Sequence, residues 1–329
     1  MVLFHADVGR EEGWGHFSEC LSVAAALRER GVRCGFVIPA QVEVAGEKAE
    51  EEGYRIFALP TANRGTAPLT KAVSELITRT SACLVANLVT LSAPYAEEVS
   101  RATDSWAVIT EHAEQERAPV NFNISCNPEY MPLHKVYCNA APRHIQETVQ
   151  QILLCFGGTD PKNACGLVLE MLRQGFERGL IPRLRVSVIL GPLFDHSNVV
   201  RAMSDTYPVK LEVKGPVTPE QLAQSAQQAD LAITTGGGTM YEFCAMGLPS
   251  VVVPVLDKMA TNAKVLQRKG AVLCTTRMDR LSARELIKAV VSLLDRQVRD
   301  AMAKAAQSAI DGRGAERISK RLFQDWGLG

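Results

Sequence analysis

The sequence predicts two open α/β domains, each built on a parallel sheet that is covered by helices on both faces. Short apolar runs alternate with longer amphipathic segments along both halves of the 329-residue chain, which is the pattern of repeated strand–helix units. An irregular stretch at residues 111–146 interrupts this alternation and predicts the junction. We place the domains at residues 1–147 and 148–329, with the last helix either in the second domain or packed back on the first.

In the first half, apolar runs of strand length are each followed by a longer segment with helical periodicity. Gly31 ends the first such helix, as expected of a glycine just past a helix end. The expected strands are residues 2–4, 33–38, 54–59, 82–88 and 106–110, and the expected helices are residues 16–30, 42–52, 69–79 and 94–102.

The second half repeats the pattern, and Gly247-Leu248-Pro249 marks the end of one of its helices. The expected strands are residues 151–156, 186–190, 210–213, 231–234, 250–253 and 271–274. The expected helices are residues 163–174, 219–229, 240–246, 261–269, 283–294, 299–310 and 315–323.

Composition excludes several classes of function. The 36 basic and 36 acidic residues give a net charge of zero, which argues against a nucleic-acid partner bound through its phosphates. Nine cysteines show no C-x-x-C spacing, so we expect reduced thiols in a cytoplasmic protein. No apolar run approaches the ~18 residues of a membrane span, and the oligomeric state is left open.

The strongest functional signal is the segment TTGGGTMYEFCAMGLPSVVVP, which starts at Thr234 directly after an apolar strand. Gly236, Gly237 and Gly238 connect that strand to a helix opened by Thr239. Such a loop lets backbone N–H groups surround a phosphate at the positive end of a helix. Glu242, one turn further on, is placed to accept hydrogen bonds from ribose hydroxyls. A tight structural turn is the alternative.

A second loop, DVGREEGWGH, follows the first strand and contains Gly13 and Gly15. It lacks the dinucleotide fingerprint G-x-G-x-x-G. His16 begins the following helix, where the helix dipole disfavours imidazolium and leaves the neutral ring that a general base requires. The alternative is that His16 only caps its helix.

A third loop, FGGTDPKN, is interpreted as either lining a ligand cleft through Gly157, Gly158 and Thr159 or capping the next helix. Thr261 and Asn262, in the segment DKMATNA at residues 257–263, are further candidates for the same cleft. Ligands of open α/β sheets bind beyond the carboxyl ends of the strands, and all these loops follow such ends. No carboxylate cluster has the spacing of a metal site, so no metal is expected.

Together these loops carry a resemblance. The patterns G-x-G-H at residues 13–16, G-G-T-D at residues 157–160, and G-G-G-T-x-x-E with G-L-P-S at residues 236–250 resemble the GT-B superfamily. The chain is most similar to the nucleotide-sugar hydrolases of pseudaminic acid biosynthesis and their spore-coat polysaccharide relatives. It is more distantly similar to the N-acetylglucosaminyltransferase that makes lipid II. The similarity covers roughly residues 1–38 and 150–274.

The resemblance implies a fold of two Rossmann-like domains facing across a cleft, with a UDP-sugar or another nucleotide-sugar as ligand. It implies that the second domain holds the nucleotide, that no metal or cofactor is used, and that His16 is the catalytic base. The chain departs from the hydrolases at Glu19, where they usually carry a basic residue. It also departs at residues 85–88, where they carry Asp-x-Tyr, and their tyrosine- and arginine-bearing segment is not recognisable in residues 127–143.

From these features we expect a nucleotide-sugar hydrolase that acts at the anomeric C–O bond in the biosynthesis of surface glycans or nonulosonate sugars. A GT-B glycosyltransferase that uses the same donor with a sugar or small-molecule acceptor is the alternative. A sugar-nucleotide-binding protein without catalysis is the third hypothesis.

Overall fold

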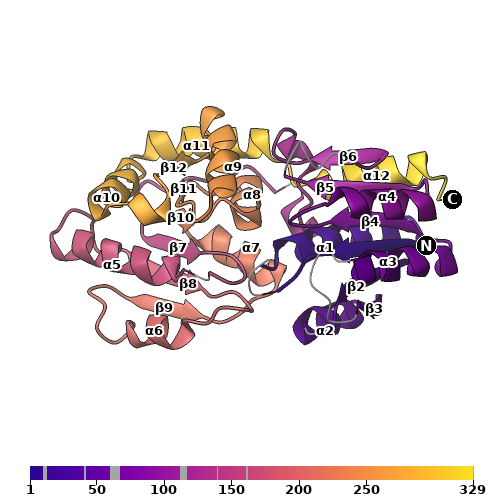
Figure 1. The fold of residues 1–329 in the computed structure, drawn as a ribbon. Coiled ribbons are helices and arrows are strands. Elements are labelled where there is room, and N and C mark those ends of the chain that lie inside the picture. The colour runs from indigo at the N-terminus through magenta and orange to yellow at the C-terminus, as the bar shows by residue number, and fades with distance from the viewer. Residues whose placement is uncertain are drawn as a thin grey trace. The chain divides into compact units, whose positions relative to one another are not determined.

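The computed structural model describes residues 1–9, 13–40, 42–59, 67–111, 117–138, 140–160 and 162–328. The chain forms two compact units. The first unit is Met1–His134 together with Arg313–Gly329, and the second is Lys135–Gly312. Each unit is built on a sheet of six parallel strands with helices between them (Figure 1), so the predicted α/β class with two parallel sheets is confirmed.

In the first unit the strand order is β3-β2-β1-β4-β5-β6. The chain runs outward from β1 to β3, then returns beside β1 as β4 and continues to β6. The strands are β1 (Val2–Ala6), β2 (Cys34–Pro39), β3 (Arg55–Leu59), β4 (Cys83–Asn87), β5 (Trp106–Thr110) and β6 (Val120–Asn123). The helices are α1 (Gly15–Arg28), α2 (Glu43–Glu51), α3 (Ala67–Thr80), α4 (Ala93–Ala102) and α12 (Gly314–Asp325), with the short 3-10 helix η2 (Pro128–Tyr130).

The central strands of this sheet are buried on both faces, which is why they read as continuous apolar runs. Leu3, Leu84 and Trp106, from neighbouring strands, are among the core residues under α3 and α4. Trp106 is fully buried and its indole Nε1 donates a hydrogen bond of 3.2 Å to Ser100 Oγ on α4. The sheet is therefore a rigid support for the loops at its carboxyl edge.

Helix α12 packs on α1, although the two helices come from opposite ends of the chain. It is the yellow helix among the indigo and purple elements in Figure 1. Ile318 and Leu322 on α12 are fully buried. Arg30 Nε donates to Ser319 Oγ at 3.3 Å, and the Arg30 guanidinium lies 6.0 Å from the centre of the Phe323 ring. Both ends of the chain therefore build the first unit.

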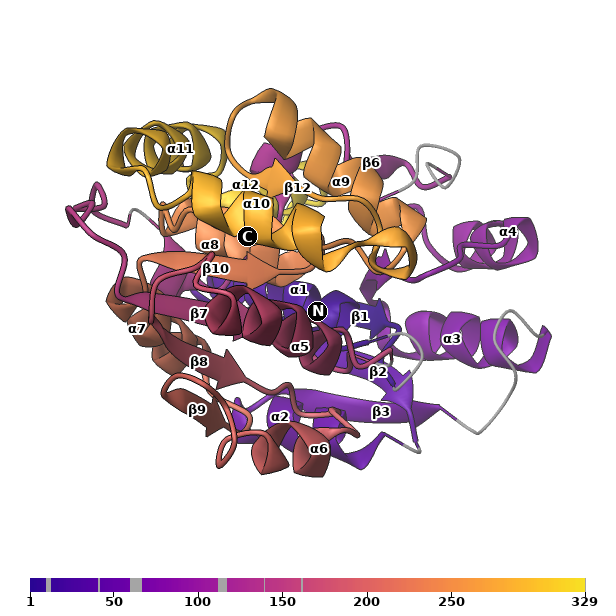
Figure 2. The same cartoon turned by 90° about the vertical axis from the view of Figure 1, so that its left-hand side faces the viewer.

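In the second unit the strand order is β12-β11-β10-β7-β8-β9. Figure 2 shows β12, β10, β7, β8 and β9 in this order from top to bottom, with α5 in front of the sheet. The strands are β7 (Gln151–Cys155), β8 (Arg185–Ile189), β9 (Leu211–Lys214), β10 (Leu231–Thr234), β11 (Ser250–Val252) and β12 (Leu273–Cys274). The helices are α5 (Ala164–Glu177), α6 (Ser197–Ala202), α7 (Pro219–Gln228), α8 (Gly238–Ala245), α9 (Asp257–Arg268), α10 (Ala283–Ser292) and α11 (Arg296–Ala309), with the 3-10 helices η3 (Lys135–Tyr137) and η4 (Met278–Arg280).

Three elements differ from the sequence-based expectations. Strand β6 was not predicted, because its sequence VNFN alternates polar with apolar residues inside an irregular stretch. The short helix α6 was also missed. Helix α9 begins at Asp257, four residues before the predicted start, with Asp257 contributing an acidic residue to its first turn. Thr261 and Asn262 therefore lie within a helix and not in a loop before it.

Candidate functional site

The loops of interest in the second unit lie at the point where its strand order reverses. The chain leaves β7 in one direction through β8 and β9, and returns on the other side of β7 as β10. The parallel register aligns Thr234, at the end of β10, with Cys155, at the end of β7. Thr234 Oγ1 donates a 2.7 Å hydrogen bond to the Cys155 carbonyl oxygen. Both glycine loops thus begin at neighbouring strand ends, where open α/β sheets bind their ligands.

The glycines 236–238 join β10 to α8. Gly237 is the N-cap residue of α8, in an extended conformation, and no side chain caps the helix. A helix beginning without a side-chain cap presents its first backbone N–H groups and the positive end of its dipole. Gly236 is packed so tightly that a Cβ would lie 2.2 Å from the Met259 carbonyl oxygen on α9. The loop geometry therefore requires glycine at this position and suits an anion.

Thr239 and Glu242 lie in the first turns of α8. Glu242 is half-buried, and burial raises the pKa of its carboxyl group from 4.5 to about 7, while a hydrogen bond from the Thr239 side chain acts in the opposite direction. Burial also raises the pKa of Tyr137, and the nearby Glu242 carboxylate adds to that shift. Glu242 is thus a hydrogen-bond acceptor whose charge changes close to neutral pH.

The loop after β7 combines a half-buried backbone with a side-chain cap on α5. Gly157, Gly158 and Thr159 are half-buried. The Asp160 carboxylate accepts hydrogen bonds of 2.8 Å from the backbone N–H groups of Ala164 and Cys165 at the start of α5. The structure thus assigns Asp160 a capping role and leaves the three preceding residues at the carboxyl edge of the sheet beside the α8 loop.

The two candidates on α9 differ in exposure. Thr261 is exposed, and its hydroxyl donates a 3.1 Å hydrogen bond to the Asp257 carbonyl oxygen one turn earlier. Asn262 is buried at 2% exposure. Met259, which the sequence reasoning did not single out, is the α9 residue that contacts the glycine loop: its carbonyl oxygen lies against Gly236, and Thr235 Oγ1 lies 2.9 Å from its sulfur.

In the first unit, His16 also lies where the strand order reverses, between β1 and β4. Gly9 and Gly13 exchange backbone hydrogen bonds of 3.2 and 2.9 Å across the loop after β1, and Gly13 has a positive φ of 88°. Gly15 begins α1 and His16 follows it in the first turn. No side chain caps α1, so the structure does not use His16 as its helix cap.

The His16 ring instead contacts the end of the neighbouring strand. Its Nδ1 lies 2.7 Å from Oδ1 of Asn87, the last residue of β4. The Asn87 Nδ2 group donates to Glu19 Oε2 at 2.7 Å and to the His16 carbonyl oxygen at 3.3 Å. Asn87 is 1% exposed and Glu19 is 9% exposed. The structure therefore brings together His16, Asn87 and Glu19, the last two from segments where the sequence departs from the hydrolases.

Two other described histidines, His5 and His196, have different settings. His5 is buried on β1 with Nδ1 2.7 Å from Tyr95 Oη, and burial lowers its pKa to about 4, against the opposing effect of the Asp7 carboxylate. His5 is therefore a neutral core residue at physiological pH. His196 stacks edge-on with Phe194 at 5.9 Å, and His112 lies outside the described residues.

Comparison with known protein families finds a similarity in the second half of the chain. Residues 167–322 match the family described as the glycosyltransferase family 28 C-terminal domain. This stretch includes the 236–238 loop, helix α8 and Glu242. This half of the chain is therefore similar to the C-terminal domain of glycosyltransferase family 28.

The chain spans only part of the length of the curated relatives that it matches. The chain is 25% identical over 207 residues to the spore coat polysaccharide biosynthesis protein SpsG of Bacillus subtilis, covering 62% of this chain and 59% of SpsG. It is 31% identical over 137 residues to the UDP-N-acetylglucosamine–N-acetylmuramyl-(pentapeptide) pyrophosphoryl-undecaprenol N-acetylglucosamine transferase of Xanthomonas campestris. That match covers 40% of this chain and 32% of the transferase.

Solved structures match the chain over nearly its whole length. Acinetobacter baumannii MurG superimposes with a TM-score of 0.66 at 16% identity, covering 98% of this chain and 99% of MurG. The MnaA–UDP co-structure from S. aureus superimposes with a TM-score of 0.67 at 12% identity, covering 100% and 97% of the two chains. These neighbours and the two six-stranded parallel sheets show that the chain has the GT-B fold.

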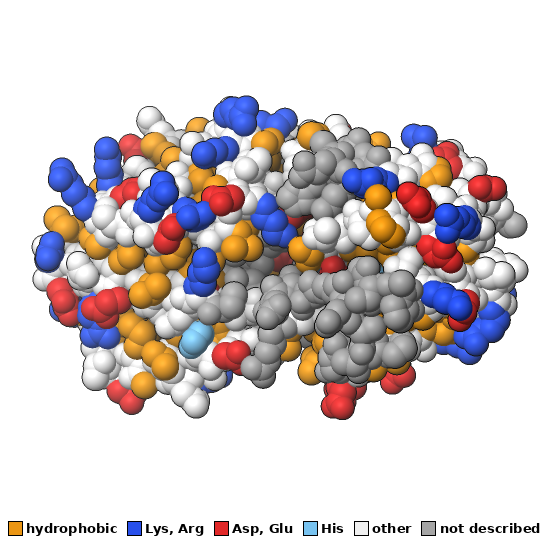
Figure 3. Space-filling view, in the orientation of Figure 1, with side chains coloured by type: hydrophobic (Ala, Val, Ile, Leu, Met, Phe, Trp, Pro, Cys, Tyr) orange, Lys and Arg blue, Asp and Glu red, His pale blue; other side chains and the backbone are white. Residues whose placement is uncertain are grey.

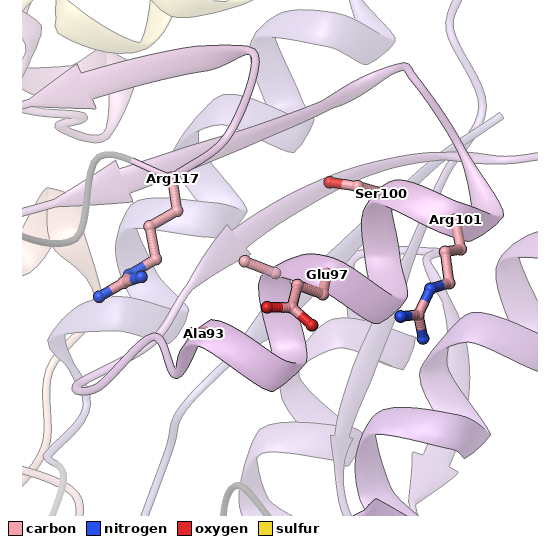
Figure 4. Close-up of a pocket in the computed structure, with 6 residues that line it drawn as sticks. Ala93, Glu97, Ser100, Arg101 and Arg117 are labelled. Atoms are coloured by element: carbon pink, nitrogen blue, oxygen red, sulfur yellow. The ribbon is translucent and has the colours of Figure 1, made fainter.

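A surface hollow in the first unit is lined by none of the predicted site residues. It has a volume of about 470 Å³ and is lined by α4 and Arg117. Figure 4 shows the Glu97 carboxylate between Arg117 and Arg101, and Arg101 is also paired with Glu98 at 3.0 Å. The open, exposed setting and the ion pair on the same helix indicate a solvated helix face.

The part of the chain that the structure describes shows neither a metal-binding group nor a membrane-spanning helix. Among the described residues, no group of three His, Cys, Asp or Glu side chains is placed to hold a metal ion. No described helix is long and apolar enough to cross a bilayer. On the face shown in Figure 3, Lys and Arg side chains are interspersed with Asp and Glu, in keeping with the zero net charge.

Proposed function

We propose that this protein is an enzyme that breaks the anomeric C–O bond of a UDP-sugar or related nucleotide-sugar. The observation that carries the proposal is the uncapped beginning of α8 behind the 236–238 loop, with Glu242 one turn into the helix. Backbone N–H groups of Gly237, Gly238 and Thr239 bind and stabilise the departing diphosphate. Glu242 accepts hydrogen bonds from the ribose hydroxyls, and Gly157, Gly158, Thr159, Thr261 and Asn262 are proposed to line the nucleotide-sugar site.

Known proteins support the ligand class. MnaA, which shares the fold, is described in a structure with UDP. The matched Xanthomonas relative is named as a transferase whose donor is UDP-N-acetylglucosamine. The SpsG match, to a protein named for spore coat polysaccharide biosynthesis, supports a place in surface-glycan synthesis. Nine free cysteines support a reducing, cytoplasmic setting.

In the proposed reaction, His16 removes a proton from a hydroxyl group as its oxygen attacks the anomeric carbon. A C–O bond forms at that carbon while the bond from it to the diphosphate oxygen breaks. UDP leaves with the electron pair of the broken bond, and the proton remains on the imidazole until solvent removes it. Gly13 and Gly15 are proposed to shape the loop that carries this base.

The attacking hydroxyl defines two versions of the reaction. Water gives the hydrolase, which is our first proposal because of the residue patterns shared with the nucleotide-sugar hydrolases. A hydroxyl of a sugar or small molecule gives a glycosyltransferase, and the family 28 match over residues 167–322 favours this second version.

UDP release from a panel of UDP-sugars, with and without candidate acceptors, tests the proposal. Release that needs no acceptor identifies the hydrolase, and release that requires an acceptor identifies the transferase. Binding without any release under either condition contradicts an enzyme and leaves a sugar-nucleotide-binding protein.

The His16→Asn variant tests the base. We expect turnover to fall by about 10²–10⁴-fold, the usual contribution of a general base. UDP affinity and melting temperature should stay near wild type, because the ring does not cap α1. Turnover within a few-fold of wild type in the folded variant would remove His16 from the mechanism.

A further inference from the structure

The contacts around His16 raise the question of which ring nitrogen carries the proton. A neutral imidazole has one N–H donor and one acceptor nitrogen, and only the acceptor nitrogen can take a proton. His16 Nδ1 lies 2.7 Å from Asn87 Oδ1. An amide oxygen only accepts hydrogen bonds, so this contact requires the His16 proton on Nδ1 and leaves Nε2 as the basic nitrogen.

This assignment depends on the orientation of the Asn87 amide, because a flipped amide would present NH₂ to Nδ1 and favour the opposite tautomer. Two acceptors lie on the other side of the amide: Glu19 Oε2 at 2.7 Å and the His16 carbonyl oxygen at 3.3 Å. A flip would place the amide oxygen against both of them. Since Asn87 is 1% exposed, water cannot readily compensate for the lost bonds.

Strand pairing and helix geometry together bring His16, Asn87 and Glu19 next to one another. The parallel pairing of β1 with β4 aligns Ala6 with Asn87, so Asn87 ends its strand beside the loop that leads to α1. Glu19 lies three residues after His16 on α1, and residues at this spacing share a helix face. His16 and Glu19, on one face of α1, thus both contact the buried side-chain amide of Asn87.

We propose that Asn87 and Glu19 are positioning residues that fix His16 in the Nδ1–H tautomer and so make Nε2 the base. This inference rests on the proposed function of His16. Glu19 orients the Asn87 amide, and the Asn87 oxygen orients the imidazole. It gives a role to residues at two of the three places where the sequence departs from the hydrolases: the Glu19 carboxylate holds the Asn87 amide, and that amide holds the ring.

The direct test is the tautomer itself, which does not depend on any substrate. Long-range ¹H–¹⁵N spectra of protein labelled at histidine distinguish Nδ1–H from Nε2–H, and the His16→Asn variant assigns the His16 signals. We expect the Nδ1–H form in the wild type. Observation of the Nε2–H form would overturn the proposal whatever the enzyme turns over.

Variants at Glu19 then test control of the tautomer. Glu19→Leu removes the acceptor and should admit the Nε2–H form and lower kcat about tenfold or more, with KM for the UDP-sugar within about threefold. Glu19→Gln keeps an acceptor oxygen and should retain the Nδ1–H form with kcat within about threefold of wild type. Equal tautomer populations in these two variants would contradict the role of Glu19.

Asn87→Leu should have the larger effect, a fall in kcat of about ten- to hundredfold, because it removes the group that contacts the ring. Tyr95→Phe is the matched control: it removes the hydroxyl 2.7 Å from Nδ1 of His5 in the same sheet and should leave the His16 signals and kcat unchanged. If His16→Asn abolishes turnover while Asn87→Leu and Glu19→Leu leave kcat within twofold of wild type, His16 remains the proposed base. The proposal that Asn87 and Glu19 position it is then wrong.

Discussion

The proposed chemistry depends on a few single residues, and only some of them could be predicted from the sequence. His16, Glu242 and the glycines stand in short patterns next to predicted strand ends, so their candidacy needs no three-dimensional information. Asn87 and Glu19 lie 68 residues apart and meet only through the register of β1 with β4. The sequence showed them as departures from a pattern, but their contact depends on the pairing of strands, which composition and periodicity do not determine.

The raised pKa of Glu242 makes nucleotide binding depend on pH. Its carboxylate must be charged to accept ribose hydrogen bonds well, and its pKa is about 7 because of burial. We expect the affinity for UDP-N-acetylglucosamine to fall roughly tenfold from pH 8 to pH 6, as the charged fraction falls. Calorimetry with this ligand is suitable because its diphosphate has no free terminal phosphate that titrates in this range.

The Glu242→Gln variant should bind more weakly at pH 8 and lose the pH dependence, whereas Glu177→Gln on the exposed end of α5 should behave as wild type. A pH profile that persists in Glu242→Gln would contradict the assignment. The same shift has a consequence for stability: the folded unit favours the protonated carboxyl, so its stability is highest below about pH 4.5 and decreases as pH rises toward 7.

Helices and strands were predicted well where burial gives their sequences a clear apolar pattern. Central strands such as β1 and β10 are buried throughout and gave clear apolar runs. Strand β6 lies at the edge of its sheet and pairs with β5 alone. Its first two residues are only half-buried and two of its four residues are asparagines, so the apolar signal is weak. The start of α9 was predicted too late because its first turn has the polar composition of a loop.

The junction of the glycine loop with α9 allows stability and binding to be separated. Gly236→Ala places a methyl group 2.2 Å from the Met259 carbonyl oxygen and should destabilise the protein by about 1–3 kcal/mol. Gly237→Ala meets its nearest neighbour at 3.9 Å and should keep stability within about 1 kcal/mol. Urea unfolding measures both variants.

If the backbone of the loop approaches the diphosphate closely, Gly237→Ala should nevertheless weaken UDP binding. Unchanged UDP affinity in Gly237→Ala would count against the loop as the phosphate site. If Gly236→Ala and Gly237→Ala have equal free energies of unfolding, the loop and α9 can move apart to accept the methyl group without a loss of stability, which contradicts the prediction.

At the scale of the whole molecule, α12 completes the first unit from the far end of the chain. Ile318→Ala should lower the free energy of unfolding of that unit by about 2–5 kcal/mol, because Ile318 is fully buried. Lys320→Ala, on the exposed face of the same helix, should change it by less than about 0.5 kcal/mol. Amide hydrogen exchange resolves the two units.

We expect Ile318→Ala to accelerate exchange in β1 and β2 while β7 and β10 keep their protection. Equal acceleration in both sheets would contradict the division into units that stabilise themselves separately. The sequence signalled this arrangement only as one of two options for the last helix, because an amphipathic helix does not specify which apolar surface it covers.

Because α12 packs on α1 but is the last helix to be synthesised, the first unit can complete its fold only at the end of translation. Residues 1–134 emerge first, but the helix that covers α1 is made only after the whole of Lys135–Gly312. At about 5–20 residues per second, translation of that intervening segment lasts roughly ten to forty seconds. Throughout this interval the nascent N-terminal unit exposes the apolar surface of α1, while the uninterrupted second unit is free to finish folding as soon as it leaves the exit tunnel.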